Sequence, residues 1–401
     1  MKKIIIIHYH EIGLKGKNRS FFEGVLFNNI KLSLKSEKIS GVHKIFGRMI
    51  VSLNENADLE SIKNKLQKVF GVAYFAIGFK GARDLEDLQS EIWQILADKK
   101  FSSYRITAKR SDKSFKLTSQ EIDAMIGSYI WKQLEKRGDV PSVDLKNPEI
   151  NVVIEITQQG TFFYLMESGG LFGQGKVKGI SGFPPGVSGN VLSLISSGFD
   201  SPVAAWKMMR RGANVSFVHF HSYPTTSLAS KENVREIIKI LTQYQFQSKV
   251  YFVPFLDVQK AIMFNCDPAY GVILYRRFMV RIAAEIAKKE NIKALVTGDS
   301  LGQVASQTLE NIAVVSQASD MLIFRPLVGE NKEDIIELAE KIGTFGISSQ
   351  PYEDCCSLFV PKHPRTKARL EDVEKMEKNL ETDNLVNDAI EKLEIEFFKY
   401  E

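Results

Sequence analysis

The chain has 401 residues, of which 44% are hydrophobic and 25% charged, and this length predicts two or three domains rather than one core. Three cysteines are too few for a disulfide framework, and no apolar run is long enough to span a membrane. These features exclude a disulfide-stapled secreted domain and a membrane protein, and they predict a cytoplasmic one. Residues 1–120 hold 22 lysines and arginines against 12 acidic residues. A basic first third predicts a polyanionic partner, with a solvated basic surface as the alternative.

Residues 1–80 alternate strand and helix patterns in the βαββαβ order of a ferredoxin-like domain. We expect strands at 2–9, 43–46, 49–53 and 72–79, with helices at 18–36 and 59–69. The loop after the first strand holds Lys15, Lys17 and Arg19 beside two glycines. Cations and accessible backbone in one loop favour contacts with phosphates, although a plain helix-entry loop has a similar composition.

Residues 81–168 show a second mixed pattern, with helices expected at 85–97 and 119–136 and strands at 104–109, 152–157 and 161–166. The segment around the first of these strands carries Lys109, Arg110, Lys113 and Lys116 interleaved with Phe115. Cations beside an aromatic ring suit an RNA surface, but a phenylalanine in this setting is more often part of a core. Residues 169–190, with two adjacent prolines, are expected to be a linker to a last domain at 191–401.

Residues 191–212 predict a phosphate site. A buried strand at 191–195 is followed by a loop of small and polar residues at 196–201 and by a helix that is closed by Gly212. Free N–H groups at such a helix start bind anions, and the serine hydroxyls add donors. Asp200 is a candidate ligand for Mg²⁺. The loop is not a Walker A motif, because no Gly-Lys-Ser/Thr follows the turn.

The rest of the chain alternates strands, expected at 215–219, 249–255, 294–297 and 322–324, with helices, expected at 234–244, 273–289 and 332–342. This order predicts a doubly wound parallel sheet, whose ligands bind at the carboxyl ends of strands. His219 and Phe220 end one strand, and Gly298 and Gln307 belong to a small, amide-rich segment after another. The two nearby histidines lack further metal ligands, so we expect no metal-binding cluster there. A charged helical tail is expected over residues 369–401.

Five segments resemble motifs of known families. Ser196-Ser197-Gly198-Phe199-Asp200-Ser201 resembles the pyrophosphatase loop Ser-Gly-Gly-x-Asp-Ser of adenylating enzymes, with Ser197 in place of the first glycine. Residues 106–127 and 143–148 resemble a THUMP domain, an RNA-binding unit of tRNA-modifying enzymes. Residues 9–19 and the block Gly-Asp-Ser-Leu-Gly-Gln-Val-Ala-Ser-Gln-Thr at 298–308 resemble the tRNA 4-thiouridine synthetases.

The resemblance implies a ferredoxin-like domain, a THUMP domain and an ATP-pyrophosphatase domain, with ATP, Mg²⁺ and tRNA as ligands. It implies adenylation of a tRNA uridine, at position 8, followed by sulfur transfer. Nucleotide contacts are then expected at Leu194, Ile195, Ser196, Ser197, Gly198, Ser201, His219, Phe220, Arg276, Gly298 and Gln307, with Lys332 near the phosphates. Cys355 and Cys356 match a sulfur-handling segment, and we favour Cys356 as the acting thiol.

Some relatives carry the persulfide on a C-terminal rhodanese domain, and this chain ends before one. Sulfur is therefore expected from a cysteine desulfurase or a separate carrier, or as sulfide. Two alternatives stay open: sulfur transfer to a carrier protein for thiamine thiazole synthesis, and a non-catalytic tRNA-binding protein. The oligomeric state is open between a monomer and a homodimer.

Overall fold

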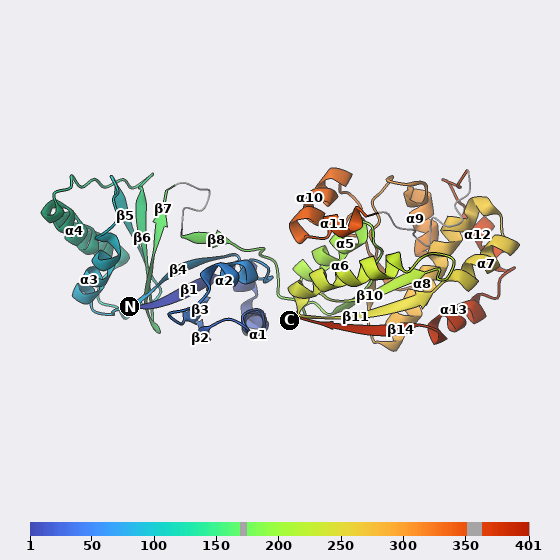
Figure 1. Ribbon diagram of the computed structural model, residues 1–401, viewed down its shortest axis with the longest axis horizontal. Coiled ribbons are helices and arrows are strands. Elements are labelled where there is room, and N and C mark those ends of the chain that lie inside the picture. Colours follow the sequence, from blue (N-terminus) through green and yellow to red (C-terminus); the bar gives the residue numbers. More distant parts are fainter. Residues whose placement is uncertain (169–174, 351–362, 401) are drawn as a thin grey trace. The chain divides into compact units, whose positions relative to one another are not determined.

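The structure, a computed structural model, describes residues 1–168, 175–350 and 363–400 (Figure 1). The chain divides into two compact units, Met1–Phe183 and Pro184–Glu401. No helix in the described ranges is both long and apolar enough to cross a bilayer.

The first unit begins with the predicted βαββαβ order. Its elements are β1 (Lys2–His8), α1 (Arg19–Ser33), β2 (Ile39–Ile45), β3 (Arg48–Leu53), α2 (Leu59–Leu66) and β4 (Tyr74–Gly81). β1 lies between β3 and β4 in antiparallel register, so that Ile6 faces Ile50 on one side and Ala76 on the other. The loop after β1 forms two short 3₁₀ helices, Glu11–Leu14 and Gly16–Asn18.

The second half of this unit extends the same sheet. Its elements are α3 (Leu85–Leu96), β5 (Tyr104–Arg110), α4 (Ser119–Arg137), β6 (Ile150–Thr157), β7 (Gly160–Glu167) and the short β8 (Lys176–Lys178). The strand order is β2-β3-β1-β4-β7-β6-β5, and β8 pairs with β4. The expected hairpin is confirmed, since Thr157 pairs with Gly160 at its tight end. β8 falls inside the stretch that we expected to be a linker.

The sheet of the first unit curls, and its concave face encloses a core. Glu155 of β6 contacts Arg48 of β3 and His8 of β1, although three strands separate β6 from β3 in the sheet order. Side chains of β1, β3, β6 and β7 fill the interior, among them Ile6 and Tyr164. On the opposite face, α3 and α4 pack on β5, β6 and β7 to form a separate core.

The second unit is the predicted doubly wound sheet. Its strands are β9 (Asn190–Leu194), β10 (Asn214–His221), β11 (Gln247–Pro254), β12 (Ala294–Val296), β13 (Leu322–Phe324) and β14 (Glu394–Lys399), in the order β13-β12-β9-β10-β11-β14. The five strands from β9 to β13 are parallel. The chain leaves β9 first toward β10 and later returns to its other side with β12, so the topological switch point lies between β9 and β12.

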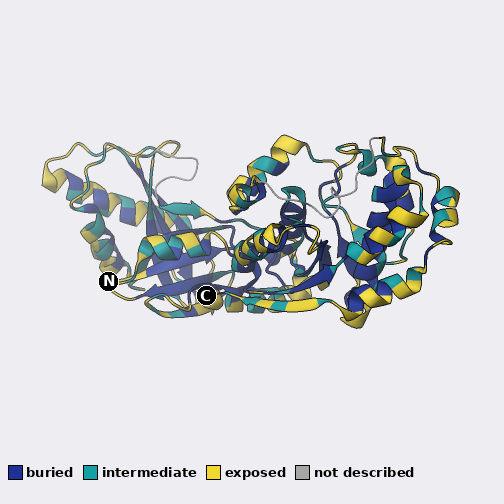
Figure 2. Ribbon diagram, turned by 45° about the vertical axis from the view of Figure 1, so that its right-hand side comes forward, coloured by how far each residue is buried: buried dark blue, intermediate teal, exposed yellow. Residues whose placement is uncertain are grey.

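Helices cover both faces of this sheet. They are α5 (Asp200–Arg210), α6 (Ala229–Gln245), α7 (Leu256–Asn265), α8 (Gly271–Lys289), α9 (Leu309–Ser316), α10 (Lys332–Ile342), α11 (Phe345–Ser348), α12 (Leu370–Glu377) and α13 (Thr382–Glu391). α8 packs against α7, α9 and α13 and is buried along most of its length (Figure 2). Gly212 has φ +87° and closes the α5 segment as expected.

Two predictions about this unit are wrong in part. The tail was expected to be helical throughout, but residues 394–399 form β14, antiparallel to β11. Glu394 and Glu396 on β14 pair with Lys231 and Arg235 of α6, at 3.0 and 2.6 Å, so the charged tail completes the sheet edge. In addition, α5 begins at Asp200, inside the loop that we expected to extend to residue 201, because the phosphate loop leads directly into the helix.

Candidate functional site

The loop between β9 and α5 is held by its own serines. The backbone N–H of Ser196 donates to Oγ of Ser201 at 2.8 Å, and that hydroxyl donates to the Ser196 carbonyl oxygen at 3.2 Å. The N–H groups at the start of α5 have no intrahelical partner, so this turn presents them as an anion site. Ser197 is buried and does not have a positive φ, so a serine fits where the family loop has glycine.

Gly298 lies directly against this loop. A Cβ at position 298 would come within 2.8 Å of the Ser201 backbone nitrogen and 3.0 Å of the Asp200 carbonyl carbon. Real Cβ atoms avoid such distances to backbone, so only glycine lets the segment after β12 approach the start of α5. Glycine at position 298 therefore allows a close backbone approach between these two segments.

Asp200 and Lys332 meet at the edge of the same loop. Nζ of Lys332 lies 2.7 Å from Oδ1 of Asp200 and 5.4 Å from the ring centroid of Phe199. The Nε2 amide of Gln303 donates to Oδ2 of Asp200 at 2.9 Å. The first residues of α5 and α10 thus place a carboxylate and an ammonium group together at the phosphate loop.

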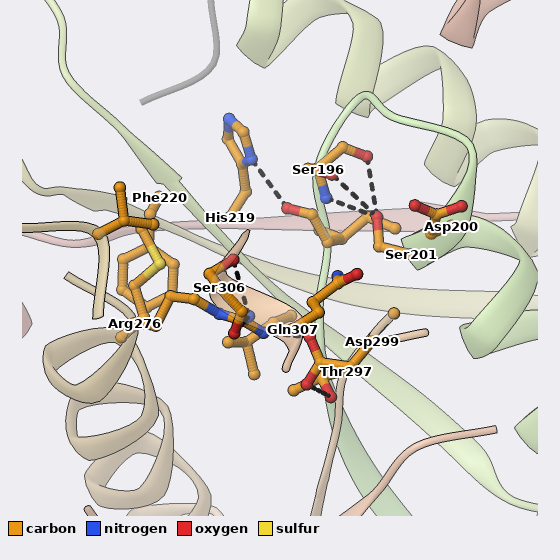
Figure 3. A pocket seen from close by; sticks show the side chains of 15 residues that line it. Ser196, Asp200, Ser201, His219, Phe220, Arg276, Thr297, Asp299, Ser306 and Gln307 are labelled. Carbon is orange, nitrogen blue, oxygen red and sulfur yellow. Dashed lines mark hydrogen bonds and ion pairs between the residues drawn. The ribbon is translucent and has the colours of Figure 1, made fainter. Parts of the chain in front are cut away.

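A cavity of about 280 Å³ opens at the carboxyl ends of β9, β10 and β12. Figure 3 shows Phe220 and Arg276 on one side of it and the serines of the loop with Asp200 on the other. Its lining includes ten of the predicted site residues, which are Leu194, Ile195, Ser196, Asp200, Ser201, His219, Phe220, Arg276, Gly298 and Gln307. Val272 and Met279 of α8 add apolar surface that the sequence did not indicate.

An ion-pair network fixes Arg276. Arg276 contacts the Asp299 carboxylate and donates to the Ser306 carbonyl oxygen at 3.1 Å. Asp299 also accepts from Thr297 at 2.8 Å and pairs with Arg325 at 3.2 Å. Burial alone would raise the pKa of Asp299, but Arg276 and its other partners hold that pKa below its ordinary value. Asp299, Arg325 and Gln303 are missed by sequence reasoning, although Asp299 and Gln303 lie inside the quoted block.

His219 is a structural part of the wall. Its Nδ1 lies 3.0 Å from the Ile195 carbonyl oxygen, and its Nε2 lies 3.2 Å from Oγ of Ser230. Both ring nitrogens are therefore engaged with α6 and the phosphate loop. Of the neighbouring arginines on α8, Arg277 and Arg281 pair with Glu377 instead of facing the cavity.

Cys355 and Cys356 lie outside the described residues, but the chain on both sides of residues 351–362 contacts the phosphate loop or the segment that follows Gln307. Before the gap, Ser348 donates to the Gly198 carbonyl oxygen at 3.4 Å, and the Phe345 ring packs 5.5 Å from that of Phe199. After it, the Asn311 amide donates to the Arg365 carbonyl oxygen at 2.8 Å. Thr308, which directly follows Gln307, donates to the carbonyl oxygen of Thr366 at 2.7 Å.

The seven cations predicted to contact RNA divide into three groups. Arg19 pairs with Glu23 at 2.7 Å, and Arg110 donates to the carbonyl oxygens of Phe115 and Leu117 at 2.8 and 3.1 Å. These two arginines hold local structure. Nζ of Lys15 lies 4.1 Å from the ring centroid of Phe183. The remaining four, Lys17, Lys109, Lys113 and Lys116, are exposed.

These features define a class: a doubly wound nucleotide-binding domain with a pyrophosphatase-type loop, on the same chain as a ferredoxin-like and THUMP unit. Family models match all three parts: the ThiI ferredoxin-like domain at residues 4–76, the THUMP domain at 82–166, and the family described as Thiamine biosynthesis protein (ThiI) at 186–382. The chain belongs to the ThiI family.

Full-length relatives support this assignment. A probable tRNA sulfurtransferase of Coxiella burnetii is 40% identical over 399 residues, which cover 98% of each chain. A protein of the same name from Thermus thermophilus is 41% identical and covers 98% of this chain and 94% of its own. A crystal structure of a 4-thiouridine synthetase in complex with RNA and bound ATP superposes over all of both chains, with a TM-score of 0.86 and 32% identity.

Proposed function

We propose that this protein is a tRNA sulfurtransferase that uses ATP to convert a tRNA uridine, at position 8, into 4-thiouridine. The observation that carries the proposal is the cavity at the switch point, where the serine loop, Asp200 and Lys332 converge. The match of the whole chain to proteins named for this reaction supports it.

In this proposal, ATP lies across the cavity. The triphosphate contacts the N–H groups of loop 196–201 and the ammonium group of Lys332, while the apolar side chains of Phe220 and Met279 border the adenine. Oxygen O4 of the uridine attacks the α-phosphorus, and pyrophosphate leaves. Alignment and charge neutralisation are the main requirements of such a transfer, and fixed cations near the loop meet the second.

The residues at the loop also fit Mg²⁺. Magnesium in nucleotide sites is commonly held by one or two carboxylates together with substrate phosphates, and the Asp200 carboxylate is placed at the phosphate loop for that role. When bound, Mg²⁺ supplies neutralisation of polyphosphate charge. Asp200 would hold it, with Gln303 keeping the carboxylate oriented through the 2.9 Å hydrogen bond.

Sulfur transfer completes the proposed reaction. Cys356 carries a persulfide received from a cysteine desulfurase or a separate carrier. Its terminal sulfur attacks C4 of the adenylated uridine, AMP leaves with the former O4, and Cys355 breaks the S–S bond by forming a disulfide with Cys356. A cellular thiol reductant then restores both thiols. Phe345 packs against Phe199 of the phosphate loop, and the Arg365 carbonyl oxygen accepts a hydrogen bond from Asn311. These contacts on both sides of the cysteine segment support a short distance between that segment and the bound nucleotide.

The first unit would hold the tRNA through lysines of the loop after β1 and of the β5–α4 segment: Lys15, Lys17, Lys109, Lys113 and Lys116. Arg19 and Arg110 would act by shaping those segments rather than by direct contact. Folded RNA is recognised largely by shape and by phosphate contacts, which suits exposed cations on a rigid sheet.

A second candidate is sulfur transfer to a carrier protein for thiamine synthesis, which the description of the matching family favours. It would use the same cavity, with a carrier carboxylate in place of the uridine. Mass spectrometry separates the two. Incubation with ATP, Mg²⁺, a persulfide donor and unmodified tRNA should give 4-thiouridine in the nucleoside digest. Absence of thiolated nucleoside, with thiolation of a carrier protein, would overturn the tRNA proposal.

A further inference from the structure

A group of cations lies at one end of the concave face of the curled sheet in the first unit. It comprises Arg48 at the start of β3, Lys109 near the end of β5 and Lys176 at the start of β8, with His10 just beyond β1. The sheet register places Lys109 beside Glu155 on β6, so both side chains are on the same face. We refer to Arg48, Lys109, Lys176 and His10 as the seam cluster, because they come from both the ferredoxin-like part and the THUMP part.

Two aromatic rings organise the cluster. The His8 and Tyr74 rings stack at 4.4 Å with an interplanar angle of 14°. Nζ of Lys176 lies 4.9 Å from the Tyr74 centroid, and the His10 ring lies 5.8 Å from it. The lysine is therefore held over a rigid ring and does not project freely from the surface, which reduces the entropy lost when it binds a ligand.

Glu155 lies beneath these cations and anchors them. Its side chain is completely buried, contacts Arg48, and lies 3.4 Å from both Nε2 of His8 and the hydroxyl of Tyr164. One carboxylate thus faces three lysine and arginine side chains, and the group keeps a positive excess. Nε of Arg48 is buried without a hydrogen-bond partner among the described residues, so this donor is left for a buried water rather than for a phosphate.

The pKa of His8 is consistent with several positive charges lying close to this ring. Burial, followed by the charges of Arg48, Lys109, Lys176 and His10, lowers the pKa of His8 to about 3. The charge of Lys109 also helps to lower the pKa of Lys176. Positive groups that repel one another on a rigid face are stabilised when an anion binds between them.

We propose that the seam cluster is a phosphate-binding site for the RNA backbone, with Lys109 and Lys176 as the contacting side chains and Glu155 as the residue that positions Arg48. The proposal rests on the proposed function in taking tRNA as the polyanion. It adds β8, Arg48 and the seam between the two parts to the RNA surface. One phosphate bound there would contact the ferredoxin-like and the THUMP parts together.

The salt dependence of tRNA binding tests this site. Each phosphate contact contributes about 0.7 to 0.9 to the slope of log Kobs against log salt concentration. With the full-length protein and unmodified tRNA, without ATP, Lys109→Ala/Lys176→Ala should lower the magnitude of that slope by about 0.7 to 0.9, the contribution of one phosphate, and weaken binding several-fold at low salt. Lys109→Arg/Lys176→Arg should restore the slope, because it keeps the charges.

Lys63→Ala/Lys132→Ala is the matched control, since it removes two cations from helices of the same unit, α2 and α4. It should leave the slope within about 0.3 of wild type. A wild-type slope in Lys109→Ala/Lys176→Ala, or an equal fall in the control, would overturn the proposal.

A site for free anions would instead bind inorganic phosphate saturably in calorimetry, while the double alanine variant would bind tRNA as the wild type does. That result also contradicts the proposal. Failure of the proposed function is distinct: wild-type protein would bind tRNA with the expected slope yet form no 4-thiouridine.

Discussion

Lys332 Nζ lies 2.7 Å from Oδ1 of Asp200, which joins the first residue of α10 to the first residue of α5 at the phosphate loop. Oδ2 of the same carboxylate accepts a hydrogen bond from Gln303. Triphosphate bound on loop 196–201 would approach both partners of this ion pair. In the proposed ATP complex, the Lys332 ammonium group would therefore leave the Asp200 carboxylate and pair with a phosphate oxygen of ATP.

The first prediction concerns this pair. Asp200→Asn and Lys332→Ala should each lower the rate of tRNA-dependent pyrophosphate release by about 10²-fold or more, because each removes a fixed charge beside the reacting phosphates. Lys341→Ala, on the exposed face of the same helix, is the control and should keep the wild-type rate. Single-turnover release measures the effect. A Lys332→Ala rate within about threefold of wild type would remove this lysine from the phosphate site.

The second prediction concerns Gly298. Gly298→Ala should raise the Kd for ATP by about tenfold or more, because the new Cβ would meet the Ser201 and Asp200 backbone and overpacking costs about 1–3 kcal/mol. Gly329→Ala is the matched control, since open space surrounds that position and its φ is not positive. Calorimetric titration of ATP gives the Kd values. Equal ATP affinity in both variants would mean that the loop tolerates separation from β12.

The third prediction concerns the buried pair between α8 and α12. Arg277 is 2% exposed, and its Nε lies 2.7 Å from Glu377. Glu377→Ala should lower the free energy of unfolding by about 3–5 kcal/mol, because it leaves buried arginines without their carboxylate. Urea denaturation measures this loss, and Glu374→Ala, an exposed change on the same helix, should alter stability by less than about 0.5 kcal/mol.

The pH dependence of that pair follows from the pKa of Glu377. Burial alone would raise it, but hydrogen bonds from Arg277 and Arg281 outweigh burial and hold it below its ordinary value. The stabilisation is then present at neutral pH and is lost as the pH falls through the folded-state pKa. A Glu377→Ala protein should accordingly approach wild-type stability in acid. A constant difference between the two at all pH values would contradict this account.

The fourth prediction concerns His221, at the end of β10. The side chain is 8% exposed, and neither ring nitrogen has a hydrogen-bond partner among the described residues. Burial, with the nearby charge of Lys231, lowers the pKa of His221 from 6.5 to about 4. Between these pH values the unfolded chain binds a proton that the folded chain does not, so stability should fall as the pH drops from 6.5 to 4.

His221→Phe should flatten the stability profile in that pH window, whereas His363→Asn, at an exposed position of the same unit, should not. Thermal denaturation at half-unit pH steps measures both. If His221→Phe keeps the wild-type pH profile, another group is responsible for the acid sensitivity.

Much of the fold follows from local patterns. The four isoleucines of β1 and the alternating strands and helices after residue 190 are strong periodic signals, and the strands expected from such patterns form in both units. The joining of the ferredoxin-like and THUMP parts into one eight-stranded sheet was not predicted. β14 was missed because its charged residues read as a helix surface, whereas Lys231 and Arg235 on α6 neutralise them at the sheet edge. That partnership joins residues about 160 positions apart, and no local pattern contains it.

The candidate site likewise combines residues that the sequence predicts with residues that only the three-dimensional structure identifies. The rule that ligands bind at strand ends selects Phe220 and Gly298, and both line the cavity. Leu194, which only the family resemblance implied, lines it as well. Asp299 and Gln303 act through partners on other elements, Arg276 and Asp200, so their roles appear only in three dimensions. The seam cluster depends still more on the tertiary structure: its four members come from four strands or their ends, and the curl of the sheet brings them together.

The central claim is that ATP bound at this loop activates O4 of a tRNA uridine. The most direct test supplies tRNA with ¹⁸O at O4 of uridine 8, together with ATP, Mg²⁺ and a persulfide donor, and measures the mass of the AMP produced. The account predicts AMP that carries the ¹⁸O label in an amount equal to the 4-thiouridine formed. Formation of 4-thiouridine with unlabelled AMP would contradict it.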